Sequence, residues 1–252
     1  MPRFYLPNAD FFENELILSD AGELHHLKNV LRVHKGERVE LFNGRGGEVS
    51  GVVEEINLKL VRIRLMTSVQ EQAFSQTKII LACAIPKKAK FEYILEKATE
   101  LGVDEIFPVQ TKRTEVKLSA ERAAQKLKRY QSVAVNAAKQ CGRSQLPVVH
   151  PVTSFKEILA TLEGVPLKII ASLVGERRAI AEILNQKFST STPSAVAILI
   201  GPEGDFTQEE TALALQNAWV PATLGPTVLK VDTAAIAVVT VVRFMGLQNQ
   251  SG

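Results

Sequence analysis

The sequence predicts an α/β protein of two domains, in which a small β-rich domain precedes a mostly parallel sheet with helices on both faces. The chain has 252 residues, more than the roughly 100–200 that one domain usually contains. Short apolar runs separated by turns fill residues 15–66, whereas beyond residue 77 such runs alternate with helix-like segments. A polar stretch at 67–77 lies between the two patterns and is the predicted linker.

The composition indicates a soluble globular protein in a reducing compartment. Hydrophobic residues make up 46% of the chain and charged residues 23%, both ordinary values. The two cysteines, Cys83 and Cys141, are too few and too far apart for a disulfide framework or a paired-cysteine zinc site. Residues 1–5 do not lead into the apolar core that a secretion signal needs. We therefore expect a cytoplasmic protein.

Short strands are predicted throughout the first half of the chain. Val49 to Ile56 and Leu60 to Leu65 are strand-like runs, and Leu41-Phe42 precedes a glycine-rich turn. Strands of this length, separated by turns, predict a small β-barrel.

The second half alternates strands with helices, a pattern typical of a parallel sheet. Apolar runs predict strands at Ile79 to Ala84, Glu105 to Val109, Lys168 to Leu173 and Ala195 to Ile200. Helical spacing predicts helices at Phe91 to Leu101 and from about Ser119 to Gly142. Ligands usually bind beyond the carboxyl ends of parallel strands, so we expect a site in the loops that follow these strands.

The last apolar segment, Thr233 to Leu247, contains conflicting signals. Val238 to Val242 has high strand propensity, yet Asp232 and Thr233 form a good helix start. We predict a buried helix, because Arg243 interrupts the segment and it falls short of the roughly 20 apolar residues of a membrane span. A helix that is apolar on all sides must be covered, and a second subunit is one candidate.

The sharpest motif is Gly201-Pro202-Glu203-Gly204, which directly follows the predicted strand Ala195 to Ile200. Its glycines allow backbone amides to approach a ligand closely, and its proline stiffens the loop. Thr207 and Glu210 form a T-x-x-E capping box, which predicts a helix start after the loop. The combination indicates a ligand site, although the spacing alone is equally compatible with an ordinary turn and a solvated Glu203.

A second loop of this kind begins at Leu224-Gly225-Pro226 and again leads into a predicted helix. Two such loops on neighbouring strands could enclose one ligand, whereas the second alone is no more than a structural turn. Neither loop is a dinucleotide fingerprint, because the three spaced glycines of G-x-G-x-x-G do not occur.

Taken together, the motifs resemble the RsmE family of 16S ribosomal RNA uridine-N3 methyltransferases in the SPOUT superfamily. The resemblance rests on Ile200 to Gly204 followed by Leu224-Gly225 and Thr233-Ala234, and it spans nearly the whole chain. The same order and spacing hold for Arg3-Phe4-Tyr5, His25-His26-Leu27, Val30-Leu31-Arg32, Lys97 to Val103, Asn136 to Gln140 and Gly142-Arg143.

The resemblance implies a fold, a cofactor and partners. Residues 1–70 would form a PUA-like β-barrel that binds RNA, and residues 75–248 a SPOUT methyltransferase domain with a C-terminal trefoil knot. General rules of chain topology would not predict the knot. The family uses S-adenosylmethionine and normally acts as a homodimer. Its substrate would be small-subunit ribosomal RNA, either free or in the assembled 30S subunit, with no membrane and no metal.

The resemblance also assigns residues to the methyl donor and to RNA. The donor-binding residues are Ser172, Leu173, Leu199, Ile200, Gly201, Pro202, Glu203, Gly204, Leu224, Gly225, Val228 and Leu229. Phosphate neutralisation and the family segments together suggest RNA contacts from Arg3, His26, Lys28, Arg32, Lys87, Lys88, Lys90, Asn136 and Gln140. The four histidines are not spaced as a metal-ligand set, so no metal is expected.

Methylation of uridine N3 requires removal of a weakly acidic proton, which indicates a carboxylate base and a stabilising cation. Glu203 or Asp232 could accept the proton, and Lys230 or Arg143 could stabilise the uracil anion. The alternatives are a plain helix N-cap for Asp232 and a solvated cation after a helix end for Arg143.

The sequence departs from the family pattern at several of these positions. Lys230 stands where the family has Arg, Asp232 where it has Glu, Thr227 where it has Arg, and Asp205 where it has Gly. Lysine offers a point charge in place of a bidentate fork. These departures leave a non-catalytic RNA-binding or ribosome-assembly factor as an alternative. The alternating strands and helices also fit a nicotinamide dehydrogenase, which the missing glycine fingerprint and the β-rich basic first half disfavour.

Overall fold

The chain divides into two compact units, each with its own hydrophobic core. The computed structural model describes residues 1–9, 11, 13–66, 70–71, 77–87, 90–114, 119–173 and 175–248. The first unit comprises residues 1–74 and 135–146, and the second comprises 75–134 and 147–252. The division differs from the predicted domains, 1–70 and 75–248, because residues 135–146 group with the first unit. Most of the predicted linker lies outside the described residues.

The first unit is built on one six-stranded sheet with the order β1-β3-β4-β5-β2, in which β6 pairs with β4. The strands are β1 (Arg3–Tyr5), β2 (Glu15–Leu18), β3 (Arg38–Phe42), β4 (Gly47–Ile56), β5 (Val61–Leu65) and β6 (Gln70–Glu71). The short helix α1 (Ala21–His25) continues into a π-helix, η1 (His26–Val30). Alternate side chains such as Phe4, Leu41 and Val53 are fully buried and form the core.

Residues 135–146 are attached to this unit by polar contacts. The ammonium group of Lys139 forms a largely buried ion pair with Glu23 of α1. The Ser144 hydroxyl donates to the carbonyl of Gly46 at 3.1 Å, and the amide of Leu146 donates to the carbonyl of Gly44 at 2.9 Å. These partners are distant in sequence, which explains why the domain boundary could not be placed from composition alone.

The second unit contains an eight-stranded sheet in which every strand pair is parallel. The strands are β7 (Lys78–Ala84), β8 (Glu105–Gln110), β9 (Val148–Val149), β10 (Thr153–Ser154), β11 (Leu167–Ala171), β12 (Arg178–Ala179), β13 (Ala195–Ile200) and β14 (Val220–Thr223). Their order is β10-β8-β7-β13-β11-β14-β12, with β9 beside β8. The four strands predicted for this half all belong to the sheet.

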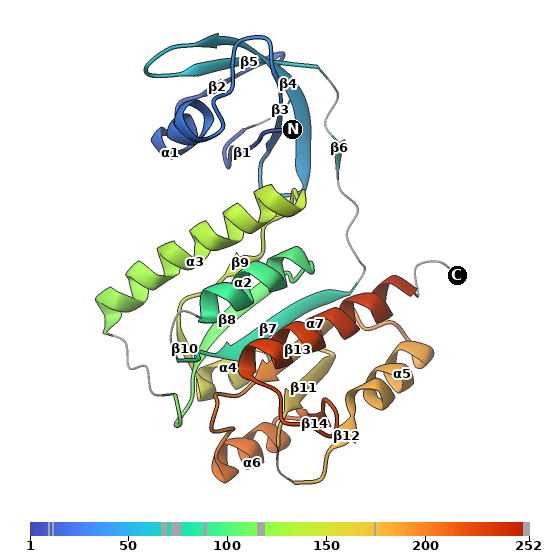
Figure 1. Ribbon diagram of the computed structural model, residues 1–252. Coiled ribbons are helices and arrows are strands. Elements are labelled where there is room, and N and C mark those ends of the chain that lie inside the picture. Colours follow the sequence, from blue (N-terminus) through green and yellow to red (C-terminus); the bar gives the residue numbers. More distant parts are fainter. Residues whose placement is uncertain are drawn as a thin grey trace. The chain divides into compact units, whose positions relative to one another are not determined.

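Helices cover both faces of this sheet, as the sequence predicts (Figure 1). They are α2 (Lys90–Glu100), α3 (Ala120–Cys141), α4 (Phe155–Thr161), α5 (Ile180–Thr190), α6 (Gln208–Gln216) and α7 (Val231–Gln248). In β7, Ile79 and Leu81 face the core shared with α2, α3, α5 and α7, whereas Ile80 and Ala82 face the core shared with α4 and α6. The helices α4 and α5 were not predicted.

The C-terminal segment is a helix, so the predicted helix outweighs the strand propensity of its valines. By length and apolar composition α7 is also able to cross a membrane, although the apolar segment predicted from the sequence is too short for a span. It nevertheless packs against β7 and β13, and residues such as Val238, Val239 and Val242 are buried there. The Arg243 side chain donates to the carbonyls of Leu101 and Gly102 after α2, which satisfies free acceptors at that helix end.

Candidate functional site

A cavity of about 480 Å³ opens in the second unit at the carboxyl ends of β11, β13 and β14. Three loops line it, with the start of α7. The lining residues are Ala171, Ser172, Leu173 and Arg177; Ile200 to Glu203 and Asp205; Ala222 to Val231; and Ala234. The two glycine-proline loops predicted to enclose one ligand therefore lie on the same cavity, and the loop after β11 completes it.

The first glycine-proline loop is tightly folded against its own neighbours. A side chain at Gly201 would begin 3.0 Å from the ring of Phe206, so only glycine fits without displacing that ring. The amide of Asp205 donates to the carbonyl of Pro202 at 2.9 Å, which closes the turn. Thr207 and Glu210 make both hydrogen bonds of the predicted capping box and start α6.

The second loop depends on a backbone conformation that favours glycine. Gly225 has a φ of 133°, which side chains other than hydrogen rarely permit. The Thr223 hydroxyl donates to the carbonyl of Gly225 at 3.0 Å and holds the turn. Val228 and Lys230 further along the loop are exposed, Leu229 between them is partly buried, and α7 begins at Val231.

The candidate acid and base groups lie in or beside this cavity. Glu203 and Lys230 line it directly. Glu203 Oε1 accepts a hydrogen bond from the amide of Lys87 at 3.1 Å. Asp232 lies in the first turn of α7, where its Oδ2 is 3.7 Å from the Lys90 ammonium. Because α7 begins at Val231, Asp232 is not the helix N-cap that the sequence offered as an alternative.

Cys83 reports that the two carboxylates share one neighbourhood. Burial raises the pKa of this thiol, and the charges of Glu203 and Asp232 raise it further. The thiol is completely buried at the carboxyl end of β7, so it is held in its neutral form and offers no nucleophile. Glu203 and Asp232 therefore both lie near the buried end of β7, and of the two only Glu203 lines the cavity.

Two of the predicted donor residues do not line the cavity. Leu199 is fully buried and packs in the core on the α4 and α6 side, because alternate residues of β13 face opposite sides of the sheet. Gly204 instead lies against the Arg113 side chain, which donates to the Gly204 carbonyl at 2.5 Å. The other ten predicted donor residues do line the cavity: Ser172, Leu173, Ile200, Gly201, Pro202, Glu203, Leu224, Gly225, Val228 and Leu229.

Sequence reasoning missed Arg177 and Asp205 as cavity residues. Arg177 belongs to no motif, so nothing in the sequence pointed to it. Asp205 was visible as a departure from the family pattern, but its role needed the hydrogen bonds of the folded chain.

The predicted RNA-binding residues are distributed over both units. Lys87 and Lys90 belong to the second unit, and Lys90 is engaged with Asp232. Lys88 lies outside the described residues. In the first unit, Asn136 and Gln140 are exposed one helical turn apart on α3.

Two other predicted residues in the first unit, Arg3 and His26, pack against neighbouring side chains. The Arg3 side chain is only 9% exposed, pairs with Glu40 and Glu48, and lies over the ring of Phe42. These contacts favour a structural role for Arg3. His26 is half-buried, and its ring meets the ring of Phe4 edge-on.

Arg143 is buried in the first unit, with 6% of its surface exposed. The alternative of a solvated cation after the helix end is therefore wrong.

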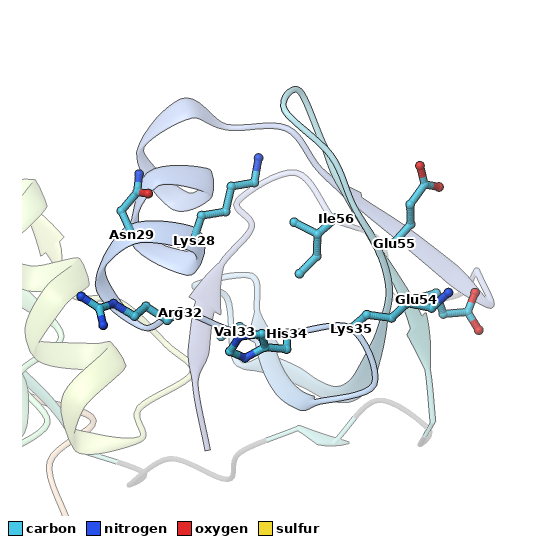
Figure 2. Close-up of a pocket in the computed structure, with 9 residues that line it drawn as sticks. All are labelled: Lys28, Asn29, Arg32, Val33, His34, Lys35, Glu54, Glu55 and Ile56. Atoms are coloured by element: carbon cyan, nitrogen blue, oxygen red, sulfur yellow. The ribbon is translucent and has the colours of Figure 1, made fainter.

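A basic groove of about 730 Å³ lies on the first unit (Figure 2). Lys28 and Asn29 come from η1, Arg32 to Lys35 come from the loop that follows, and Glu54 to Ile56 come from β4. The Glu54 carboxylate accepts a hydrogen bond from Arg64 at 2.6 Å, and Glu55 pairs with Arg62 at 3.5 Å. Lys28, Arg32 and Lys35 outnumber these two acids among the lining residues, so the groove has a net positive character.

Comparisons with known proteins point to one family. Residues 73–243 match the model of an RNA methyltransferase domain, and residues 18–66 match that of an RNA methyltransferase PUA domain. A protein from Synechocystis named ribosomal RNA small subunit methyltransferase E is 33% identical over 216 residues, which are 84% of this chain and 68% of the relative. The Bacillus subtilis protein of the same name is 29% identical over 226 residues, 88% of this chain and 87% of the relative.

The fold is also similar to that of a solved structure over nearly the full length of the chain. The Neisseria gonorrhoeae protein of that name, bound to S-adenosyl methionine, superimposes with a TM-score of 0.84 at 29% identity and covers 97% of each chain.

We expect Gly225→Ala to lower the free energy of unfolding by about 1–3 kcal/mol, because alanine is strained at this φ. A methyl group at this position meets no atom within 4 Å, so any loss comes from the backbone alone. Gly164→Ala is the matched control, since it also has open space but no positive φ. Urea unfolding of the three proteins measures the difference. Equal stability of Gly225→Ala and the unaltered protein would contradict the account of this loop.

Proposed function

The chain belongs to the ribosomal RNA small subunit methyltransferase E family, and from this premise we propose that it methylates N3 of a uridine in 16S ribosomal RNA. The methyl donor is S-adenosylmethionine. The observation that carries the proposal is the cavity formed by the loops that the family motifs occupy. The enzyme is a cytoplasmic protein in this proposal, and its substrate is small-subunit RNA, free or within the 30S subunit.

The residues of the cavity fit the donor. A volume of about 480 Å³ lies within the range usual for small-molecule sites. Aliphatic side chains such as Leu173, Leu224 and Leu229 offer apolar walls for a flat adenine ring. The Glu203 carboxylate can face the positive sulfonium and ammonium groups of the donor, and Arg177 and Lys230 can face its carboxylate. When bound, the donor supplies an electrophilic methyl group on sulfur.

The chain's own residues handle the proton and the charge. As N3 attacks the methyl carbon, the carbon–sulfur bond breaks and the N3 proton passes to a carboxylate. The position of Glu203 on the cavity wall supports this role for it, and Asp232, in the first turn of α7 next to the lining residue Val231, is the alternative. Lys230, also on the cavity wall, would stabilise the uracil anion. Arg143 belongs to the other unit and remains a candidate for the same role.

The basic groove of the first unit is the proposed contact for the RNA backbone. Lys28, Arg32, His34 and Lys35 line different sides of it (Figure 2). Its acidic residues, Glu54 and Glu55, are each in contact with an arginine. Such groups bind phosphates without reading the sequence, which suits a domain that positions a large RNA. Asn136 and Gln140 offer additional polar contacts from the same unit.

We propose further that two chains associate through α7. Val241, Phe244 and Leu247 are 37%, 59% and 43% exposed, and their spacing places them along one side of the helix. An exposed apolar stripe on a helix whose other side packs in the core is typical of a protein interface. The C-terminal trefoil knot remains a prediction from the family resemblance.

We expect the protein to transfer labelled methyl from S-adenosylmethionine to small-subunit RNA that lacks this modification, with label recovered as 3-methyluridine. Free 16S RNA and 30S subunits are tested separately. Glu203→Gln and Asp232→Asn are compared, and the variant that removes the base should lower kcat roughly 10²–10⁴-fold. Glu209→Gln is the control, because Glu209 is exposed on α6 outside the cavity. Donor binding without any transfer would contradict the proposal and favour a non-catalytic factor.

In the basic groove, we expect the double variant Arg32→Ala/Lys35→Ala to raise the KM for RNA about 10-fold or more at moderate salt. Its binding should also depend less steeply on salt, with a slope smaller by roughly 1–2 because up to two phosphate contacts are lost. Arg38→Ala/Lys59→Ala removes the same charge from exposed positions of the same unit outside the groove. If both pairs change the salt slope equally, the groove is not the RNA contact.

For the interface, we expect sedimentation equilibrium to give twice the chain mass of 27.6 kDa for the unaltered protein and a monomer for Phe244→Glu. Burying an unpaired carboxylate between two apolar helices is strongly unfavourable. Leu58→Glu is the matched control, because Leu58 is 95% exposed on the first unit. A monomeric unaltered protein, or a dimeric Phe244→Glu variant, would contradict association through α7.

A further inference from the structure

Asp205 occupies a backbone conformation that disfavours side chains. Its φ is 59°, and among the described residues only Arg32 and Ala218 are other non-glycine residues with positive φ. Asp tolerates this region better than most residues but still less well than glycine. A glycine would suit this backbone better than the aspartate does, so the contacts of the aspartate side chain must offset that strain.

The side chain of Asp205 joins two loops of the cavity. Its Oδ2 accepts a hydrogen bond from the amide of Leu173 at 2.9 Å. The residue is only 9% exposed and lies on the cavity wall. Leu173 follows β11 and Asp205 follows β13, two neighbouring strands whose last residues, Ala171 and Ile200, are paired. The carboxylate thus connects the two loops just beyond the last residues at which β11 and β13 pair.

Leu173 needs such a partner because the strand ladder ends before it. The amide of Ser172 still donates to the carbonyl of Ala222 at 3.3 Å, but β11 itself stops at Ala171. One residue later the acceptor for the amide is a side chain, Asp205. Arg177 donates to the Ser172 carbonyl at 3.2 Å, so both sides of this short segment are tied. Leu173 keeps a half-exposed apolar side chain on the cavity wall.

The backbone on either side of Asp205 is fixed by hydrogen bonds from the loop after β8. Arg113, in the loop after β8, donates to the carbonyl of Gly204 at 2.5 Å and to that of Phe206 at 3.3 Å. These two carbonyls flank Asp205 in the chain. Lys112 fixes the next helix start, because its amide donates to the Glu210 carboxylate at 2.8 Å. The loop that carries Asp205 is therefore anchored to the sheet from outside the cavity.

We propose that Asp205 is a positioning residue that holds Leu173 in the place where it forms the wall of the donor site. This rests on the proposed function, because it assigns a task within the same cavity. A carboxylate hydrogen bond to a backbone amide is charge-assisted and stronger than a neutral one. The Asp205 carboxylate holds the Leu173 amide by a hydrogen bond, which a glycine at this position could not form. We therefore expect Asp205 to strengthen binding of the donor and to take no part in the chemical step.

The test compares Asp205→Gly, Asp205→Asn and Ala218→Gly for S-adenosylmethionine affinity by calorimetry, for donor KM and kcat, and for Tm. Asp205→Gly relieves the backbone strain and removes the acceptor, so we expect Kd and donor KM to rise about 10-fold. Its kcat at saturating donor should stay within about threefold, and its Tm should not fall. Asp205→Asn keeps an acceptor oxygen and should restore affinity to within about threefold. Ala218→Gly relieves the same kind of strain away from the cavity and should leave affinity unchanged.

Three results would overturn the assignment. Donor affinity of Asp205→Gly within twofold of the unaltered protein would show that the bridge is not needed. Equal loss in Asp205→Asn and Asp205→Gly would show that the charge contacts the donor directly. A loss of affinity that merely follows a fall in Tm would show a general structural role. Failure of the unaltered protein to bind S-adenosylmethionine would instead refute the proposed function, and the assignment with it.

Discussion

The structure of the second unit depends on the parallel placement of β11 between β13 and β14. Ala171 pairs with Ile200 on one side and with Ala222 on the other. Three chain segments that are far apart in sequence therefore leave the sheet at the same edge and in the same direction. The cavity follows directly, because each strand is succeeded by a loop that turns toward the other two. Any change that shifts this register would separate the three loops.

The loops themselves are held by a few strong local interactions. The first is closed by its own turn and by the helix cap at Thr207, and the second by the backbone freedom of Gly225. Side-chain bonds then fix the loops to one another and to the sheet, from Asp205 to Leu173 and from Arg113 to Gly204. A cavity built in this way needs little reorganisation when a ligand binds, and that preserves affinity.

Much of this arrangement could be predicted from the sequence, for reasons that differ between elements. Apolar runs such as 195–200 predict buried strands, and the Thr207 and Glu210 pair predicts the start of α6, because both signals are local. The order of the strands is non-local, and the knot is expected only from the family resemblance. Leu199 does not line the cavity, because motif matching ignores which face of a strand a residue occupies. Arg3 carries a charge that suggested RNA, and only its neighbours Glu40 and Glu48 show how that charge is used.

The most direct test of the central claim, that these three loops form the donor site, is hydrogen–deuterium exchange with and without saturating S-adenosylmethionine. We expect slower amide exchange in peptides covering residues 172–173, 200–206 and 222–231, which line or adjoin the cavity. Peptides from β3 and β4 of the first unit should not change, because they belong to a separate core. Protection that is absent, or confined to segments away from these loops, would contradict the account.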